Sequence, residues 1–217
     1  MQNSMSRVME RGPQEGVSKN GAKTRAVATT RRFTDPFIEE FRLLAMNVLA
    51  LLEGNPRKAI TIFSHGRGDG RTRIAVELSR ALAQHTDVLL IDGQPNATGL
   101  HESLLITGPS SGGRQPDVAE PLIPTDQRRL WLSAASQDGA GGDLAHRMKE
   151  AMAAGMMVII DAPPSEASSD AFMLAQRSQN VLYVMRNKPQ DMAPHRRAMD
   201  HLRRLDTRVL GIVLNDR

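Results

Sequence analysis

The sequence predicts an α/β fold with three layers, α/β/α, doubly wound around a mainly parallel sheet. Short, continuously apolar runs alternate along the 217 residues with stretches of helical periodicity. This alternation is typical of parallel strands that helices bury on both faces. Two of the apolar runs end in an aspartate, and the first runs directly into a glycine-rich loop. Because such sheets bind ligands beyond the carboxyl ends of their strands, these positions are the first candidates for a site.

The elements begin at Asp35, where Asp-Pro suits the cap and first turn of a helix that stops at the Gly54-Asn55-Pro56 breaker. Strands are predicted at Ala59–Phe63, Val88–Ile91, Leu130–Ala134, Met156–Ile160, Val181–Met185 and Val209–Leu214. Later helices are predicted at Thr72–Gln84, Leu144–Ala154, Ala171–Gln176 and from Met192 to Leu205. The long stretch Gln94–Arg129 has no clear period, so we expect a functional or mobile loop there.

Composition limits the classes of protein to consider. Hydrophobic residues make up 40% of the chain and charged residues 24%, an ordinary balance for a globular domain. The absence of cysteine excludes disulfides, thiolate zinc sites and a cysteine nucleophile. No apolar run reaches the roughly 18 residues of a membrane span, and the N-terminus lacks the apolar core of a signal peptide. We therefore expect a cytoplasmic protein.

Basic charge is concentrated in residues 1–32. This segment holds seven Lys or Arg against two Glu, a net charge of +5, which leaves −1 for residues 33–217 of the total +4. Its polar composition and lack of apolar period predict a disordered tail ahead of one folded domain at 33–217. Two interpretations stay open for the tail: a solvated leader, or a contact with anionic lipid head groups or nucleic acid.

The loop after the first strand reads Ser64-His-Gly-Arg-Gly-Asp-Gly-Arg-Thr72 and leads into a helix. This is the arrangement of a P-loop, in which glycine amides and a helix N-terminus surround phosphate groups. Thr72 stands where the motif's Ser or Thr ligates Mg²⁺. His65 replaces the motif's first glycine and Arg71 replaces its lysine. The alternative is a turn that only joins strand to helix.

Asp92 and Asp161 end two of the predicted strands. Carboxylates at the ends of adjacent parallel strands are suited to holding the water shell of Mg²⁺ and positioning an attacking group. Taken singly, each aspartate would be ordinary loop-cap chemistry. The six histidines show no zinc-ligand spacing and are expected at solvated positions.

Residues 35–217 resemble the cytoplasmic bacterial tyrosine kinases of capsule and exopolysaccharide synthesis, within the class of deviant Walker ATPases that includes MinD and ParA proteins. The matching segments, besides the P-loop, are Glu39–Leu44 with Asn47, VLLID ending at Asp92, VIIDAPP at Val158–Pro164, Ser169–Ala171 and VLGIVLN ending at Asn215.

The resemblance implies ATP and Mg²⁺ as cofactors and assigns residues to them. The residues it implies for nucleotide binding are Gly66, Gly68, Asp69, Gly70, Arg71, Thr72 and Asn215, the last at the adenine. Thr72, Asp92 and Asp161 would hold the metal, and Asp92, Asp161 and Arg71 would be the catalytic residues. It also implies a membrane polysaccharide chain-length or export protein as partner, a homo-oligomer, and a place at the inner face of the membrane. Nucleic acid is not expected as a partner.

The departures from this family point to weakened phosphotransfer. Arginine is bulkier than lysine at a close phosphate contact, so Arg71 is not a conservative replacement. The second Walker motif keeps Asp92 but has Gln94 where the family has its second acid. Ala45 stands where the family's helix motif has an arginine, which counts against ring assembly. The only tyrosine, Tyr183, lies in a predicted buried strand, so the usual C-terminal cluster of autophosphorylated tyrosines is missing.

Three functions therefore compete. The first is a nucleotide-binding regulator of exopolysaccharide or capsule synthesis and export, with weakened or lost phosphotransfer. The second is an active tyrosine kinase or ATPase of the same family, with Arg71 serving as the lysine. The third is a positioning ATPase of the MinD and ParA kind. The helix around Glu39 favours the first two, and the substituted motifs favour the first.

Overall fold

The computed structural model describes residues 36–94, 100, 116–118, 122–134, 142–188 and 190–216. The basic tail at 1–32 and most of the long loop expected at 94–129 lie outside the described residues. Within these ranges the helices are α1 (Pro36–Leu51), α2 (Arg71–Leu82), α4 (Gly142–Ala153), α5 (Asp170–Ser178) and α6 (Met192–Arg204). The strands are β1 (Ala59–Phe63), β2 (Val88–Asp92), β3 (Ile123–Pro124), β4 (Leu130–Ala134), β5 (Met157–Asp161), β6 (Asn180–Arg186) and β7 (Arg208–Asn215).

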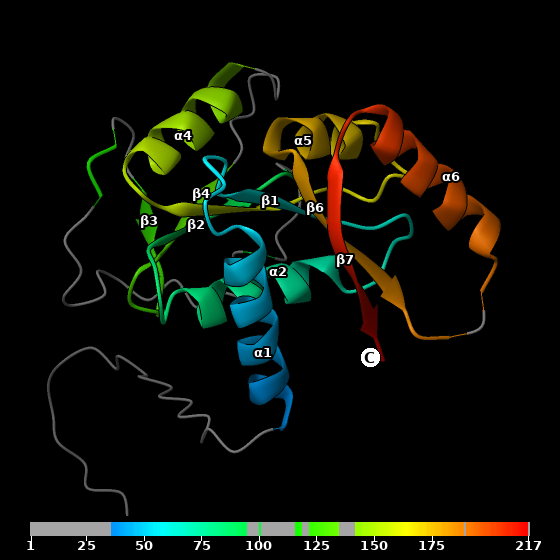
Figure 1. Cartoon of the computed structure of the whole chain (residues 1–217), viewed down its shortest axis with the longest axis horizontal. Coiled ribbons are helices and arrows are strands. Elements are labelled where there is room, and N and C mark those ends of the chain that lie inside the picture. Colours follow the sequence, from blue (N-terminus) through cyan, green and yellow to red (C-terminus); the bar gives the residue numbers. More distant parts are fainter. Residues whose placement is uncertain are drawn as a thin grey trace, which may run out of the picture. The chain divides into compact units, whose positions relative to one another are not determined.

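These strands form one sheet in the order β3-β4-β2-β5-β1-β6-β7. Every neighbouring pair is parallel except β3 and β4, so the predicted mainly parallel, doubly wound α/β architecture is confirmed. Figure 1 shows α4, α5 and α6 on one face of the sheet and α1 and α2 on the other. None of the helices among the described residues is long and apolar enough to cross a membrane.

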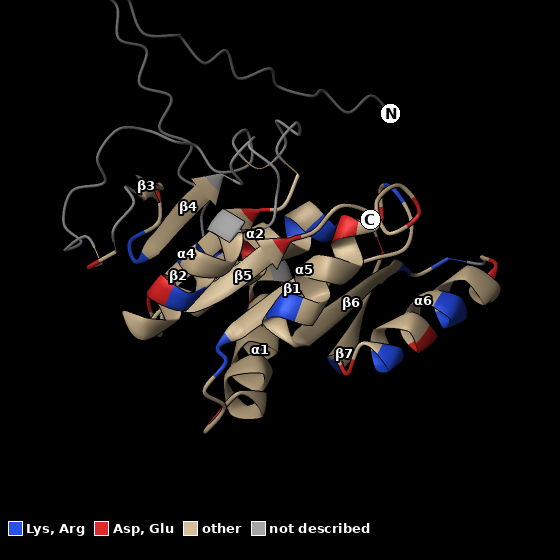
Figure 2. Cartoon of the chain, turned by 90° about the horizontal axis from the view of Figure 1, so that it is seen from above, with Lys and Arg blue, Asp and Glu red and all other residues tan. Residues whose placement is uncertain are grey.

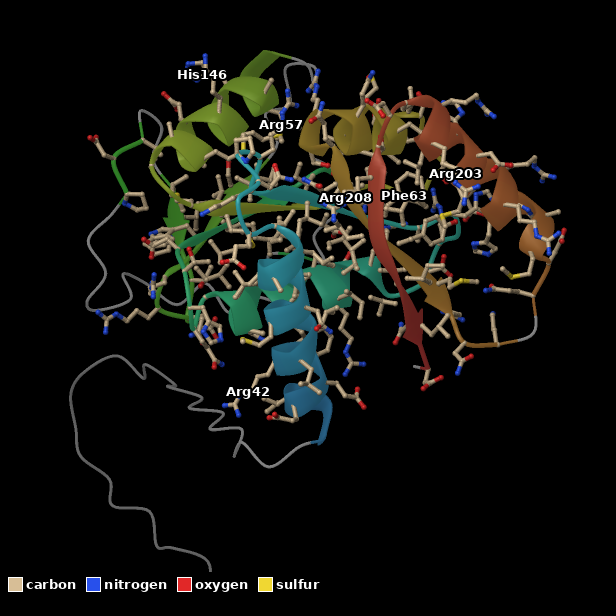
Figure 3. All side chains as sticks on the ribbon, in the orientation of Figure 1. Arg42, Arg57, Phe63, His146, Arg203 and Arg208 are labelled. Atoms are coloured by element: carbon tan, nitrogen blue, oxygen red, sulfur yellow. The ribbon has the colours of Figure 1, made fainter. Side chains whose placement is uncertain are left out.

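The central strands supply both hydrophobic cores. Along β1, Ile60 and Ile62 point toward α1 and α2, whereas Phe63 points toward α5 and α6, where its ring centroid lies 5.5 Å from that of Tyr183. Phe63 is labelled among the side chains of Figure 3. Burying each such side chain contributes roughly 1.5–3 kcal/mol to folding. This two-sided burial is why these strands are continuously apolar in the sequence.

The first helix packs one face against α2 and the core on that side of the sheet, and it exposes the other face. Phe41, Ala45 and Val48 recur at helical spacing and are buried, whereas Leu43 and Met46 are exposed. Ala45 has no exposed surface. An arginine at this position would therefore enter the core, which gives a physical reason for its absence here.

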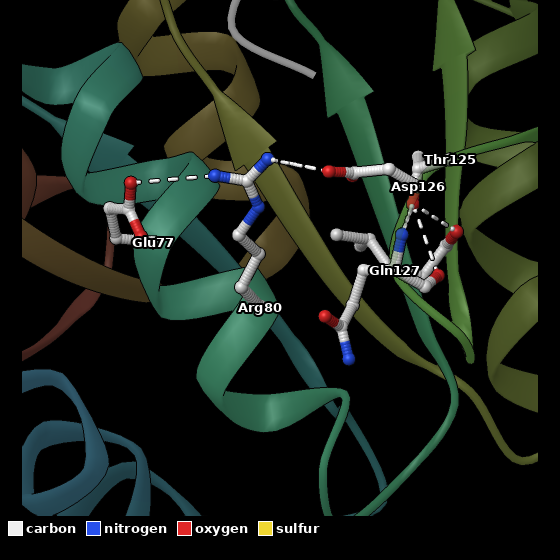
Figure 4. Close-up of polar contacts among 6 residues, drawn as sticks. Glu77, Arg80, Thr125, Asp126 and Gln127 are labelled. Carbon is white, nitrogen blue, oxygen red and sulfur yellow. Dashed lines mark hydrogen bonds and ion pairs between the residues drawn. The ribbon is translucent and has the colours of Figure 1, made fainter. Parts of the chain in front are cut away.

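An ion pair joins α2 to the turn between β3 and β4, at one edge of the sheet. The guanidinium of Arg80 lies 3.5 Å from the Glu77 carboxylate and 3.3 Å from that of Asp126 (Figure 4). Asp126 belongs to the turn that joins β3 to β4, and the neighbouring Thr125 hydroxyl donates to the backbone carbonyl of Leu130 at 2.9 Å. Half-exposed ion pairs of this kind contribute little individually, about 0–1 kcal/mol.

Several predictions from sequence need correction. The strand β3 was not predicted, because two residues are too short to show a period. The helix α2 begins at Arg71 rather than Thr72, and β2 and β5 have Asp92 and Asp161 as their last residues, one residue beyond the predicted ranges. The expectation of solvated histidines is wrong for His195, which is buried with Nδ1 3.0 Å from the Tyr183 hydroxyl.

Candidate functional site

The loop between β1 and α2 has the backbone conformation of a phosphate-binding loop. Gly68 and Gly70 adopt φ angles of +73° and +91°, a left-handed region that favours glycine. Gly70 is the N-cap of α2: its carbonyl oxygen accepts from the Ile74 amide at 3.0 Å, but because glycine has no side chain it makes no side-chain cap to the first helical amides. The amides of the first helical turn therefore point out of the helix without intrahelical partners, with the positive end of the helix dipole behind them. An anion is the natural ligand of such a terminus.

The ends of β6 and β7 hold this loop in place. Arg186 donates from Nε to the carbonyl oxygen of Gly68 at 2.8 Å, and Asn215 donates from Nδ2 to that of Asp69 at 2.9 Å. A Cβ on Gly70 would lie 2.1 Å from the Asn215 Nδ2 atom, so only glycine permits this approach. Asn215, assigned to the adenine by resemblance, thus also contacts the loop. Arg186 was missed because no motif marks it.

The predicted acids come together beside the loop. Asp92 and Asp161 are paired neighbours in the register of β2 and β5. The Thr72 hydroxyl donates to Asp161 Oδ2 at 2.6 Å, while Asp161 Oδ1 is buried and has no hydrogen-bond partner among the described residues. Burial raises the pKa of Asp161 to about 6, against the opposing effects of the Thr72 hydrogen bond and the Arg71 charge. An unpartnered carboxylate oxygen beside a hydroxyl is the donor set that Mg²⁺ prefers.

Close backbone packing keeps Asp92 near Asp161. Gly93 donates its amide to the Asp161 carbonyl oxygen at 2.9 Å, and a Cβ on Gly93 would lie 2.6 Å from that same oxygen. The backbone amide of Gln94 donates to Asp92 Oδ1 at 2.8 Å, and its side-chain Nε2 donates to the Ala162 carbonyl oxygen at 3.3 Å. The neutral side-chain amide of Gln94 thus lies at the end of β5. The second acid of the family's second Walker motif would bring a negative charge to this position.

Arg71 points back beneath the loop. Its Nη1 donates to the Ser64 hydroxyl at 2.7 Å, and only 7% of the residue is exposed. Its Nε atom is buried without a hydrogen-bond partner within the described residues. Burial lowers the pKa of the Arg71 guanidinium, and nearby carboxylates, that of Asp161 first, oppose the shift. The cation is therefore present in the loop but is engaged by the protein itself.

Two further carboxylates brace the loop. Asp69 accepts from the amide of Gly66 at 3.0 Å and is buried, so its side chain faces the inside of the turn. Glu166 accepts from the amide of Arg67 at 2.6 Å. Glu166 was not predicted from the sequence, because it follows the VIIDAPP segment in a local pattern that any exposed loop acid would share. Each bond uses a loop amide that would otherwise be available to an anion.

The metal-binding prediction rests on few protein ligands. In the described part of the chain, no group of three or more His, Asp or Glu side chains is placed to hold a metal ion. Two carboxylates and one hydroxyl are available at Thr72, Asp92 and Asp161. Mg²⁺ commonly keeps several waters and shares phosphate oxygens, so a set of this size is compatible with a nucleotide-bound ion.

No protein-family model and no curated protein matches the sequence. Solved structures do match. The BceF tyrosine kinase domain is 18% identical over 82% of this chain and 76% of its own, with a TM-score of 0.67. The VpsO kinase domain is 23% identical over 83% and 98%, with a TM-score of 0.62.

A third match extends the comparison beyond kinases. The septum site-determining protein MinD from Pyrococcus horikoshii, solved with Mg-ADP, is 19% identical over 72% of this chain and 69% of its own, with a TM-score of 0.55. This chain has the P-loop NTPase fold. The neighbours confirm, at the level of fold, the resemblance to bacterial tyrosine kinases and MinD-type ATPases that the sequence predicts. The loop at 64–72, between β1 and α2, is the candidate for the P-loop of this fold.

Proposed function

We propose that this chain is a nucleotide-binding regulator of exopolysaccharide or capsule synthesis, with weakened or lost phosphotransfer. It binds ATP or ADP with Mg²⁺ at the P-loop and responds to the nucleotide by changing its association with a membrane partner. The pathway rests on the sequence resemblance to the capsule and exopolysaccharide kinases. The nucleotide rests on the loop and on the acids beside it.

The residues present fit a Mg²⁺ nucleotide. The α2 N-terminus and the amides of Gly68 and Gly70 would take the phosphates. Thr72, Asp92 and Asp161 would hold the ion, and the buried, unpartnered Oδ1 of Asp161 supports this assignment. When bound, Mg²⁺ neutralises phosphate charge and orients the terminal phosphate.

Two other residues of the site, Arg71 and Gln94, argue for poor phosphoryl transfer. A P-loop cation has to reach the terminal phosphates, whereas the Arg71 guanidinium is bonded to Ser64 and lies under the loop. Gln94 leaves the acid cluster one carboxylate short of the family pattern. Displacement of a catalytic group by about 1 Å costs on the order of a hundredfold in rate. The burial of Arg71 against Ser64 is the single observation that carries the regulator proposal.

Calorimetric titration with MgADP and MgATP tests the binding half of this proposal. We expect both to bind the wild type, and Thr72→Val to weaken binding of the Mg²⁺ form at least about tenfold, since it removes a metal ligand. Thr61→Val is the matched control, because the Thr61 hydroxyl bonds inside the core to Ser178 and Leu174. Absence of binding by the wild type at millimolar nucleotide would leave only the structural-turn alternative.

The active kinase or ATPase is the second candidate. The bond from Thr72 to Asp161 and the register that brings Asp92 beside Asp161 favour it, because these three side chains would position a metal ion. A positioning ATPase of the MinD kind shares the fold. Measuring phosphate release from MgATP by the wild-type protein distinguishes both of these enzymes from a regulator, which would release little.

The partner and location form the last part of the proposal. A membrane polysaccharide chain-length or export protein would recruit the chain to the inner face of the membrane, with the basic residues 1–32 contacting anionic lipid. A homo-oligomer is the third expected contact, although Ala45 in place of the family's arginine counts against ring assembly. Co-purification with the chain-length protein, measured with and without MgADP, tests the partner. Equal recovery in both conditions would argue against nucleotide control.

A further inference from the structure

The two edges of the sheet differ in how they are protected. At one edge, β3 is two residues long and contains Pro124. At the other, β7 has eight residues, RVLGIVLN, with neither proline nor lysine; its one register shift lies at Leu210, and Gly211–Asn215 pair regularly with β6. Proteins usually blunt an exposed edge with short strands, proline or lysine, so β7 is an edge open to another strand. Within the described residues no strand pairs with its outer side.

Exposed apolar side chains lie along this edge on the side of α6. Ile212 and Leu214 are 51% and 56% exposed. They stand next to Tyr183 and Met185 in the register of β6 and β7, and these two belong to the core that α6 covers. Residues adjacent in register share a face of the sheet. Figure 1 shows β7 as the last strand of the sheet, with α6 packed on the same face as α5.

A pocket of about 310 Å³ opens between α6 and this edge. Its apolar walls are Met185, Met192, Met199 and Ile212. Tyr183 and His195 also line it, and their polar atoms are already joined by the 3.0 Å hydrogen bond. Because methionine side chains adapt to irregular shapes, the pocket suits one medium-sized apolar side chain.

The rim of the pocket is basic. Arg196, Asp200 and Arg203 of α6 line it. Asp200 pairs with Arg203 at 3.2 Å, whereas the Arg196 guanidinium is exposed and has no partner among the described residues. Figure 2 shows the Lys and Arg segments of α6 in blue, and Figure 3 labels Arg203. One net positive charge therefore stands beside the apolar pocket.

We propose that the groove between β7 and α6 binds an extended segment of a partner protein in which apolar and acidic side chains alternate. The segment pairs with β7 as an eighth strand, places one apolar side chain in the methionine-lined pocket and sets a carboxylate beside Arg196. Strand addition supplies affinity through main-chain hydrogen bonds, and the pocket and rim supply specificity. This site is separate from the P-loop and goes beyond the proposed nucleotide function.

Charge decides between the possible occupants. A second copy that paired its own β7 here would bring a second set of Arg196 and Arg203 side chains to the same face of the joined sheet. Residues 1–32 carry a net charge of +5, which also repels the rim. Like-charge contacts disfavour both, whereas an acidic segment is attracted.

Selection of a random dodecapeptide phage library on the immobilised full-length chain tests this site. We expect enriched peptides to alternate an apolar residue with Asp or Glu. A synthetic copy of the best peptide should lose binding when alternate backbone amides on one side are N-methylated, and keep it when those on the other side are. That pattern reports strand pairing, which electrostatic attraction alone does not produce.

Substitutions in the groove and outside it test where the selected peptide binds. Arg196→Glu should weaken binding about tenfold, and Arg197→Glu, also exposed on α6 but outside the pocket, less than about threefold. Met199→Trp should block the pocket, with Met173→Trp on α5 as control, and Ile212→Glu provides a second test at an exposed position. The proposal is overturned by peptides that lack the alternation, by binding that survives Met199→Trp and Ile212→Glu, or by a concentration-dependent dimer that Ile212→Glu abolishes.

Discussion

Replacing Arg71 with lysine should raise nucleotide affinity at little cost in stability. The substitution removes the 2.7 Å bond from Nη1 to the Ser64 hydroxyl. A hydrogen bond to a charged group contributes about 1.5–3 kcal/mol. It also removes the buried Nε that has no partner among the described residues, whose presence costs about 1–3 kcal/mol. The two nearly offset each other, so the free energy of unfolding should change by less than about 1.5 kcal/mol.

The affinity gain follows from releasing the cation. A lysine ammonium is compact and no longer bonded to Ser64, so it is free to reach the phosphates. A charge-assisted bond gained at the phosphate is worth about 1–2 kcal/mol, which corresponds to roughly 5- to 30-fold tighter MgATP binding. Because Gln94 still leaves the acid cluster one carboxylate short, ATP turnover should stay low until Gln94→Asp is added.

Calorimetric titration and thermal unfolding of wild type, Arg71→Lys and Arg71→Lys/Gln94→Asp measure these effects, with Arg73→Lys as control. Arg73 is exposed in the same helical turn, so its replacement should change MgATP affinity less than about twofold. If restoring the lysine leaves affinity unchanged while the protein stays folded, the inference that Arg71 is withheld from the phosphates is wrong.

Four further predictions concern other parts of the molecule. Gly93→Ala should destabilise the fold by about 1–3 kcal/mol and weaken Mg²⁺-nucleotide binding, because its Cβ would meet a backbone oxygen at 2.6 Å; urea unfolding and calorimetry check both effects. Since burial raises the Asp161 pKa to about 6, its contribution to stability is greatest at low pH and is lost as pH rises toward and through 6; Asp161→Asn should flatten this dependence in thermal scans from pH 4 to 8. Mass spectrometry after incubation with MgATP should find no phosphate on Tyr183, which is 1% exposed. Deleting residues 1–32 should leave the melting temperature unchanged yet reduce sedimentation with acidic vesicles, where each base adds about 1 kcal/mol; undiminished sedimentation would favour the solvated leader.

Sequence reasoning recovered the parts of the fold that period and composition encode. The strands ending at Asp92 and Asp161 were recognisable because burial on both faces makes them continuously apolar, and parallel pairing then forces their carboxyl ends together. The P-loop was recognisable because left-handed turns require glycine. These two signals were enough to predict the fold and to bring Thr72 and the two acids into one site.

The remaining features depend on contacts between distant segments. Arg71 reads as a phosphate ligand from its place in the motif, and only packing shows that it bonds Ser64. Arg186 holds the loop from β6, across more than a hundred residues, and no local pattern marks such a contact. His195 is buried because Tyr183 supplies a partner for its ring nitrogen, a pairing that spacing along the helix does not reveal.

Phosphate release by the wild-type chain at saturating MgATP tests the regulator proposal most directly. Calorimetry on the same sample first establishes that the nucleotide is bound, and Asp161→Asn provides the background rate. With Arg71 engaged by Ser64 and Gln94 in place of an acid, we predict bound nucleotide and a rate indistinguishable from that of Asp161→Asn. Turnover well above this background would contradict the regulator and identify an active kinase or ATPase.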